Sequence, residues 1–110
     1  MGKKETKVQT QIKDWLKDNH FYCFKCIVSS VDGTSDIIAV SPKGRYIAIE
    51  VKQGSGRPSA LQLEFINEVN KRGGIGFVSW DLQTVIHKLQ GEIEGGYAGE
   101  EDTTDTTIYL

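Results

Sequence analysis

A short stretch, residues 32–62, constrains this chain most, because it combines two strand-like runs with acidic residues. Residues 36–40 and 46–51 are rich in β-branched residues, which is typical of strands. Pro42 and Gly44 lie between them and are typical turn residues. With Gly44 in the left-handed position of a turn centred on Lys43, the two runs form a β-hairpin.

The expected register of this hairpin brings two acidic residues together. The predicted cross-strand pairs are Val40 with Tyr46, Ile38 with Ala48, and Asp36 with Glu50. Because side chains alternate along a strand, Lys52 lies on the same side of its strand as Glu50. Like charges that face each other destabilise a hairpin, and a divalent cation between them reverses that effect. An ordinary surface ion pair is the alternative, since Glu-x-Lys is common at strand spacing.

An acidic pair with a neighbouring lysine suits chemistry on phosphates. Magnesium accepts oxygen ligands from one or two carboxylates and keeps several waters when it works on phosphate groups. Lys52 beside the pair then holds or polarises the attacking water, or neutralises charge that develops on the phosphorus oxygens.

The motifs in this region occur in an order that resembles a known group of nucleases. Gly33-Thr-Ser-Asp36, Ile49-Glu-Val-Lys52, Gly56-Arg57 and Gln62 are similar to the PD-(D/E)xK nuclease superfamily, and more narrowly to its VRR-NUC (virus-type replication-repair nuclease) family. That family usually has an acidic residue in a first helix, here matched by Glu5, and the resemblance covers roughly residues 5–89. Ser35 stands where the superfamily has proline, a position whose side chain performs no chemistry.

The resemblance implies a restriction-endonuclease-like α/β fold. We expect a mixed β-sheet flanked by helices, in the order α-β-β-β-α-β-α. Strands are expected at residues 21–28 and 75–80 besides the hairpin, and helices after the capping residues Ser59 and Asp81.

The resemblance also implies a function, that of a Mg²⁺- or Mn²⁺-dependent endonuclease that hydrolyses DNA phosphodiester bonds. Asp36, Glu50 and the carbonyl of Val51 would bind the metal, Lys52 would assist the water, and Glu5 and Gln62 would complete or support the ligand set. Stand-alone, phage-type members of the family act as homodimers in DNA repair on branched DNA, including four-way (Holliday) junctions. The alternatives are a flap-type repair nuclease and a non-catalytic DNA-binding module of the same fold.

Glu5 and Gln62 each have a second, structural interpretation. Apolar residues at helical spacing between residues 3 and 19 place Glu5 on the inward stripe, whereas an exposed first-turn glutamate is stabilised by the helix dipole. Gln62 faces the Glu50 end of the sheet, and it also completes a capping box with Ser59.

Three cations are predicted to contact DNA. Arg57 lies in a Gly- and Ser-rich loop and can bind a phosphate in bidentate fashion, or that loop is an ordinary linker. Lys43 in the hairpin turn and Lys7 in the first helix are the other two. Lys7 contacts phosphate or only keeps the helix soluble, and the sequence does not separate these roles.

The length and the charge pattern favour one domain with an acidic tail. The chain has 110 residues, enough for a single core, so we expect a nuclease-like domain at residues 1–90 and a partly flexible Gly- and Thr-rich tail at residues 91–110. All 13 Lys and Arg but only nine of the 15 acidic residues precede residue 91, which gives the first 90 residues a net charge of +4. The apolar, β-prone residues 106–110 are predicted to add an edge strand to the same subunit or to a partner.

Neither the apolar runs nor the cysteines change this interpretation. No apolar run approaches the ~20 residues that span a bilayer, and the Lys-rich start lacks a signal-peptide core, so we expect a cytoplasmic protein, in the host cytoplasm if it is phage-encoded. Cys23 and Cys26 fall on opposite faces of a strand, which favours free thiols over a zinc site or a redox pair.

Overall fold

The element order of the protein is the one predicted. The computed structural model describes residues 5–27 and 29–94, so the predicted docking of residues 106–110 lies outside the described residues. The elements are α1 (Lys7–Asp18), β1 (Tyr22–Lys25), β2 (Ile37–Val40), β3 (Tyr46–Val51), α2 (Ala60–Lys71), β4 (Ile75–Ser79) and α3 (Leu82–Ile93). None of the helices in the described part of the chain is long and apolar enough to cross a membrane.

The sheet has four strands in the spatial order β1-β2-β3-β4. β1, β2 and β3 pair in antiparallel fashion, and β4 pairs with β3 in parallel. The predicted hairpin register is confirmed, with Val40 opposite Tyr46 and Ile38 opposite Ala48, and Gly44 has the expected positive φ of 86°. β2 begins at Ile37, so Asp36 lies one residue before the ladder and Glu50 inside β3.

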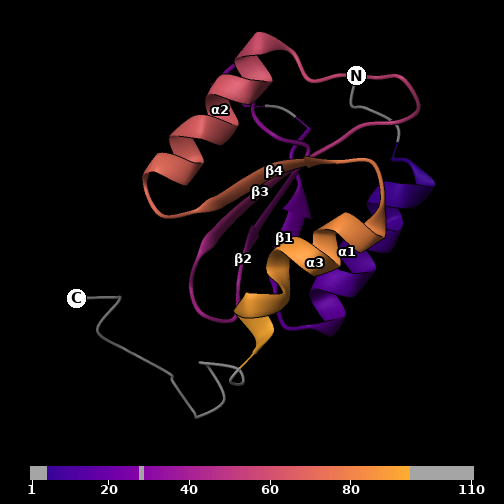
Figure 1. The fold of residues 1–110 in the computed structure, drawn as a ribbon, viewed down its shortest axis with the longest axis vertical. Helices are drawn as coiled ribbons and strands as arrows, with labels where there is room; N and C mark the ends of the chain where they lie inside the picture. The colour runs from indigo at the N-terminus through magenta and orange to yellow at the C-terminus, as the bar shows by residue number, and fades with distance from the viewer. Residues whose placement is uncertain (1–4, 28, 95–110) are drawn as a thin grey trace.

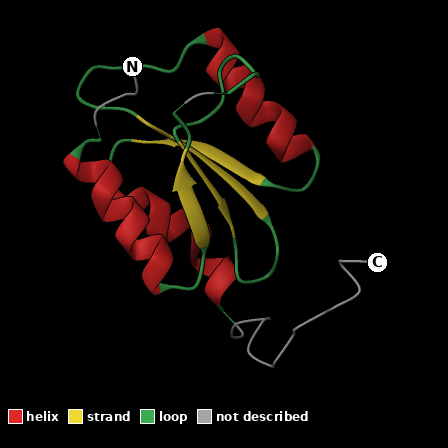
Figure 2. Cartoon of the chain, turned by 180° about the vertical axis from the view of Figure 1, so that it is seen from behind, coloured by secondary structure: helices red, strands yellow, loops and turns green. Residues whose placement is uncertain are grey.

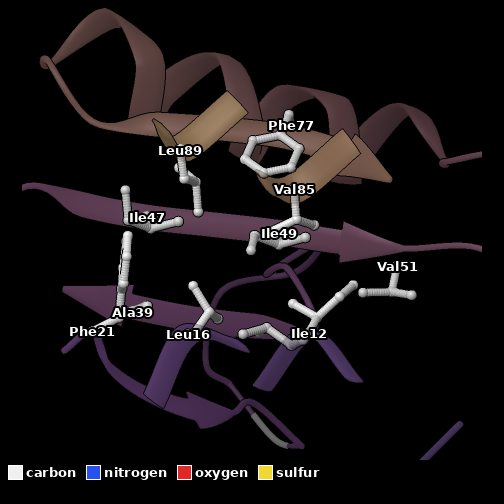
Figure 3. Close-up of a cluster of buried hydrophobic side chains, with 11 residues drawn as sticks. Ile12, Leu16, Phe21, Ala39, Ile47, Ile49, Val51, Phe77, Val85 and Leu89 are labelled. Atoms are coloured by element: carbon white, nitrogen blue, oxygen red, sulfur yellow. The ribbon is translucent and has the colours of Figure 1, made fainter. Parts of the chain in front are cut away.

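Helices cover both faces of the sheet (Figure 1). α1 and α3 lie together on one face, α2 lies on the other, and Figure 2 shows the same layers from behind. Alternate strand residues such as Ile47 and Ile49 point into the α1/α3 layer, where they pack against residues of both helices (Figure 3). The residues between them, including Ala48 and Glu50, therefore face the α2 side.

The starts of the helices are fixed by hydrogen-bonded caps. Ser59 and Gln62 form the predicted capping box of α2, and Asp81 caps α3. Thr6 and Gln9 form a second capping box, which starts α1 at Lys7. Glu5 therefore precedes the helix, and its predicted place on the inward helical stripe is wrong.

The domain extends past the predicted boundary at residue 90. α3 continues to Ile93, and the side chain of Glu92 is buried. Its carboxylate accepts a hydrogen bond from Ser41 Oγ at 2.6 Å and lies 3.5 Å from Arg45 Nη1. Glu92 is therefore part of the domain, where it ties the end of α3 to the β2–β3 turn.

Gly33 brings the loop before β2 against the start of α2. Its φ is +82°, and a Cβ built on it would lie 2.3 Å from the carbonyl oxygen of Leu61 and 2.8 Å from the amide nitrogen of Gln62. Only a glycine fits this close approach. The Gly-x-x-Asp motif thus places the loop that leads to Asp36 beside the α2 N-terminus.

We predict that Gly33→Ala destabilises the protein more than Gly44→Ala does. Both glycines have a positive φ, but no atom lies within 4 Å of a Cβ at Gly44. Gly44→Ala should cost about 1 kcal/mol in the free energy of unfolding, and Gly33→Ala ~3 kcal/mol or more, because the methyl group also displaces backbone. Urea unfolding of both variants measures the difference, and equal losses would contradict the close packing at Gly33.

Candidate active site

The predicted acidic pair forms at one end of the sheet. Asp36 lies directly before β2, Glu50 is the second-last residue of β3, and Lys52 directly follows β3. The amide of Cys26 donates a hydrogen bond to the carbonyl of Asp36 at 2.7 Å, which extends the β1–β2 pairing by one residue. The sheet therefore fixes the main chain of Asp36 as firmly as that of a strand residue.

Both carboxylates are buried. The relative exposure of Glu50 is 0% and that of Asp36 is 3%. The Val51 amide donates a hydrogen bond to Asp36 Oδ2 at 3.0 Å, and Lys52 Nζ lies 3.2 Å from Glu50 Oε2. Lys52 is thus at ion-pair distance, but neither buried Glu50 oxygen receives a well-aligned hydrogen bond from a described residue.

This environment makes the ionised form of Glu50 costly. Burial, followed by the negative charge of Asp36, raises the pKa of Glu50 to about 7, while Lys52 acts in the opposite direction. A carboxylate in this position gains from any positive charge that can reach it. Below about pH 7 a bound proton neutralises the carboxylate, and at higher pH a bound cation can balance its charge.

The site fits a divalent cation that prefers oxygen ligands. Two carboxylates approach each other, and the two Glu50 oxygens lack hydrogen-bond partners among the described residues. The hydroxyl of Ser35, beside Asp36, is also buried without such a partner. Residues 5–27 and 29–94 contain no cluster of three or more His, Cys, Asp or Glu arranged for a metal. The described residues thus offer two carboxylates, and a magnesium ion held by them would take its remaining ligands from water or substrate. The Val51 carbonyl as a further ligand stays a prediction.

Glu5 makes its side-chain contacts with α1 residues, and its role as a metal ligand stays a prediction. Its carboxylate binds Lys13 Nζ at 2.6 Å and Thr10 Oγ1 at 2.5 Å on the surface of α1. These contacts, with Lys13 the larger, lower the pKa of Glu5 below its ordinary value. The structure therefore gives Glu5 a local role at the start of α1.

Gln62 has the capping role. Its side-chain Oε1 accepts a hydrogen bond from the main-chain amide of Ser59 at 2.8 Å. Its main-chain amide donates a hydrogen bond to Ser59 Oγ at 3.1 Å. Gly33 packs against the main chain at this point, so Gln62 lies at the border of the site loop. A direct role of its side chain at the carboxylates stays a prediction.

The three predicted DNA-binding cations lie in different places. Lys43 is in the β2–β3 turn at the opposite end of the sheet, where its ammonium donates to the Gly91 carbonyl at 2.8 Å. Lys7 is the exposed first residue of α1. Arg57 lies in the loop that follows Lys52, and its guanidinium lies 5.4 Å from the ring centroid of Trp80. Of the three, only Arg57 belongs to the loop that leaves the acidic pair.

The sequence motifs assign no function to two residues near the site, Trp80 and Ser35. Trp80 directly follows β4 and contacts the Arg57 loop through its ring and its indole nitrogen. An aromatic residue at the carboxyl end of a strand, next to the strand that carries Glu50, is a signal that the sequence does contain.

Two hollows adjoin this end of the molecule. A small one of about 200 Å³ is lined by Asp36, Cys26 and loop residues between them. A larger one of about 610 Å³ runs along α2 and is lined mainly by apolar residues, including Tyr46, Leu61 and Phe65. Because Glu50 lines neither hollow, the larger one is not the acidic site.

Neither Cys23 nor Cys26 forms a disulfide bond. Cys23 Sγ lies 3.8 Å from the Lys13 carbonyl on the α1 side, whereas Cys26 lines the small hollow beside Asp36. Their side chains lie on opposite faces of the sheet, which excludes a bridge between them.

Comparison with known proteins supports the fold. A solved structure described as a VRR_NUC domain protein is similar to this one, with a TM-score of 0.67 and 24% sequence identity. The similarity covers 88% of this chain and 93% of that chain. No protein-family model matches the chain. No curated protein matches it either. The structural likeness shows that the chain has the fold that its sequence motifs led us to expect.

We predict that the metal-free protein loses stability as the pH rises from about 4.5 to about 7. The folded pKa of Glu50 is about 7, against an ordinary value of 4.5, so the folded state retains a proton that the unfolded state releases in this window. The loss attributable to Glu50 is at most about 3 kcal/mol, the equivalent of this pKa difference between 4.5 and about 7.

Glu50→Gln provides the control, because a neutral amide has no charge to desolvate. The free energy of unfolding is measured with urea at several pH values. Between pH 4.5 and about 7, it should fall in the wild type relative to Glu50→Gln. A difference that is independent of pH would contradict the assignment.

Proposed function

We propose that this protein is a metal-dependent endonuclease that hydrolyses DNA phosphodiester bonds. The observation that carries the proposal is the buried acidic pair, in which neither Glu50 oxygen receives a well-aligned hydrogen bond from a described residue and Lys52 lies at ion-pair distance, 3.2 Å. A buried carboxylate pair costs stability without a cation. Its presence at the end of the strands is therefore better explained by function than by packing.

In this proposal, each residue of the acidic site has a separate role. Asp36 and Glu50 hold Mg²⁺ or Mn²⁺, and the Val51 amide fixes the Asp36 carboxylate at 3.0 Å so that one of its oxygens is oriented before the metal binds. The metal supplies a Lewis acid and lowers the pKa of a bound water. The Lys52 ammonium holds the attacking water or stabilises the negative charge that develops on the phosphoryl oxygens.

The fold supports a nucleic-acid substrate. The similar solved structure is described as a VRR_NUC domain protein, in which NUC abbreviates nuclease, and the first 90 residues of this chain have a net charge of +4. A domain of this size has little surface to read a base sequence, so it recognises the shape of DNA more easily. We propose branched DNA, in particular four-way (Holliday) junctions, as the substrate. Flap structures, or DNA bound without cleavage, are the alternatives.

We predict that Lys52→Ala reduces cleavage of a labelled four-way junction at least ~100-fold in Mg²⁺ while leaving junction binding nearly unchanged. Lys52 acts on the reacting water or phosphate and contributes one cation among many to binding. Cleavage is measured on gels and binding by fluorescence anisotropy without metal. Lys17→Ala, at the end of α1 remote from the site, is the matched control and should cleave as wild type does. A Lys52→Ala protein that cuts at the wild-type rate would show that the assignment is wrong.

A substrate panel separates the shape-selective proposal from its alternatives. We expect junctions to be cut faster than flaps, and flaps faster than plain duplex, with the same order in Mg²⁺ and Mn²⁺. Equal rates on plain duplex and junction would contradict selectivity for branched DNA. Binding without cleavage in either metal would favour the binding module.

We also propose a homodimer, which the exposed surface of the sheet supports. α2 packs against β3 and β4, and the α2 side of β1 and β2 carries large exposed apolar residues. These are Tyr22, Phe24 and Val40, with Tyr46 beside them on β3. Tyr46 is shared by two hollows, one lined also by the acidic residues Asp32 and Glu64 and the other by Lys43. A two-fold related copy places the acidic side of one subunit against the basic side of the other, around an apolar centre.

We predict that Phe24→Glu converts the dimer to a monomer. Phe24 is 49% exposed and lies in the apolar centre of this face, so a charge there opposes burial against a second copy. Leu63→Glu is the control, because Leu63 is 45% exposed but lies on α2. Size-exclusion chromatography with light scattering measures the mass. A monomeric wild type, or a dimeric Phe24→Glu protein, would contradict this interface.

A further inference from the structure

The loop between β3 and α2 is more ordered than its composition suggests. It contains Gly54, Gly56 and Ser55, and it carries Arg57. The Gly56 amide donates to the Gln53 carbonyl at 2.8 Å, which closes a turn. A Cβ at Gly56 would lie 2.9 Å from that carbonyl oxygen, so the turn requires glycine.

Trp80 fastens this turn to the end of β4. Its indole nitrogen donates to the Gly56 carbonyl at 3.2 Å, and Arg57 Nη1 donates to the same carbonyl at 2.8 Å. The Arg57 guanidinium lies 5.4 Å from the Trp80 ring centroid, at cation–π distance. One aromatic side chain thus contacts both the main chain of the loop and the guanidinium of Arg57.

A main-chain hydrogen bond also joins the start of this loop to the residue before Trp80. The Lys52 amide donates to the Ser79 carbonyl at 3.0 Å, so the residue before Trp80 is hydrogen-bonded to the residue that starts the loop. Ser79 Oγ donates to the Asp81 carbonyl at 2.6 Å and fixes the turn that follows Trp80. Lys52 and Trp80 are therefore held in a constant relative position by the β3–β4 pairing.

These loop contacts do not account for the exposed ring of Trp80 or for the charge of Arg57. Trp80 is 38% exposed and lies outside the apolar core. Within residues 5–27 and 29–94, Arg57 has no carboxylate at ion-pair distance, whereas Lys13, Arg45, Lys71 and Arg72 each have one. Stacking on the ring orders the guanidinium without neutralising it, and most of its donors stay available for an anion.

We infer that Trp80 is a positioning residue that holds Arg57 for a DNA phosphate next to the bond cleaved at the Asp36–Glu50 pair. This inference rests on the proposed function and names a binding contact for it. A stacked arginine loses little conformational entropy when it binds a phosphate, because its planar group is already ordered. Removing the ring should therefore weaken DNA binding through Arg57, although Trp80 carries no charge.

The test is a double-mutant cycle on the full chain. Arg57→Ala, Trp80→Leu and the double variant are titrated with a labelled four-way junction, without metal, at several salt concentrations. We expect Arg57→Ala to weaken binding about tenfold, Trp80→Leu nearly as much, and the double variant no more than Arg57→Ala alone. Arg57→Ala and Trp80→Leu should each reduce the salt dependence by about one phosphate contact. Trp80→Phe, which keeps a ring beneath the guanidinium, should recover part of the affinity.

Matched measurements separate a positioning role from a structural one. Lys17→Ala removes an exposed cation remote from the loop and should keep the wild-type affinity. The thermal midpoint of Trp80→Leu is measured in parallel, but only a lost phosphate contact changes the salt dependence. Wild-type affinity and salt dependence in Trp80→Leu, or additive effects of the two substitutions, would overturn the inference and leave the nuclease proposal intact. A wild type that binds none of the DNA probes would overturn both.

Discussion

Asp36 and Glu50 are buried next to each other, and the surrounding strands and loops have to hold this unfavourable pair in place. Two carboxylates at 3% and 0% exposure repel each other and have lost their hydration. The Val51 amide and the Lys52 ammonium offset only part of that cost. The strands can hold the pair because their alternate residues, such as Ile37, Ile49 and Val51, are anchored in the α1/α3 core on the other face. Apolar packing on one face thus stabilises a polar arrangement that is unfavourable by itself.

The loops around this pair complete the arrangement from three directions. Gly33 brings the loop before β2 to the main chain of α2, and the amide of Lys52 joins the end of β3 to β4. Trp80 then fastens the Arg57 loop to the same end of the sheet. A site whose supports come from separate elements is rigid when all of them are in place, which is the condition for oriented chemistry.

The hairpin and its acidic pair could be predicted from the sequence because their determinants are local. Turn residues at Pro42 and Gly44 and the alternation along the strands fix the register, and the register fixes which side chains share a face. Glu5 was misplaced because two local signals compete at that point. The apolar spacing extends back to residue 5, but Thr6 and Gln9 form a capping box that starts the helix later. That box is visible in the sequence and outweighs periodicity at a helix end.

Contacts between distant segments could not be predicted in the same way. Glu92 resembles the acidic residues that follow it, and only its contacts with Ser41 and Arg45 show that it belongs to the domain. The stacking of Arg57 on Trp80 likewise joins residues that no periodic pattern connects. Such contacts depend on how loops meet after the sheet has formed, and they carry much of the specificity of a site.

Calorimetric titration with Mn²⁺ tests most directly whether the acidic pair is a metal site. Wild type, Asp36→Asn and Glu50→Gln are compared at pH 7.5 without DNA, because each substitution removes one of the two negative charges while keeping the shape of the side chain. We expect saturable Mn²⁺ binding in the wild type and an affinity at least about tenfold lower in each variant, the scale on which a ligand contributes to a metal site. Equal Mn²⁺ affinity in all three proteins, or no binding to the wild type, would contradict this expectation.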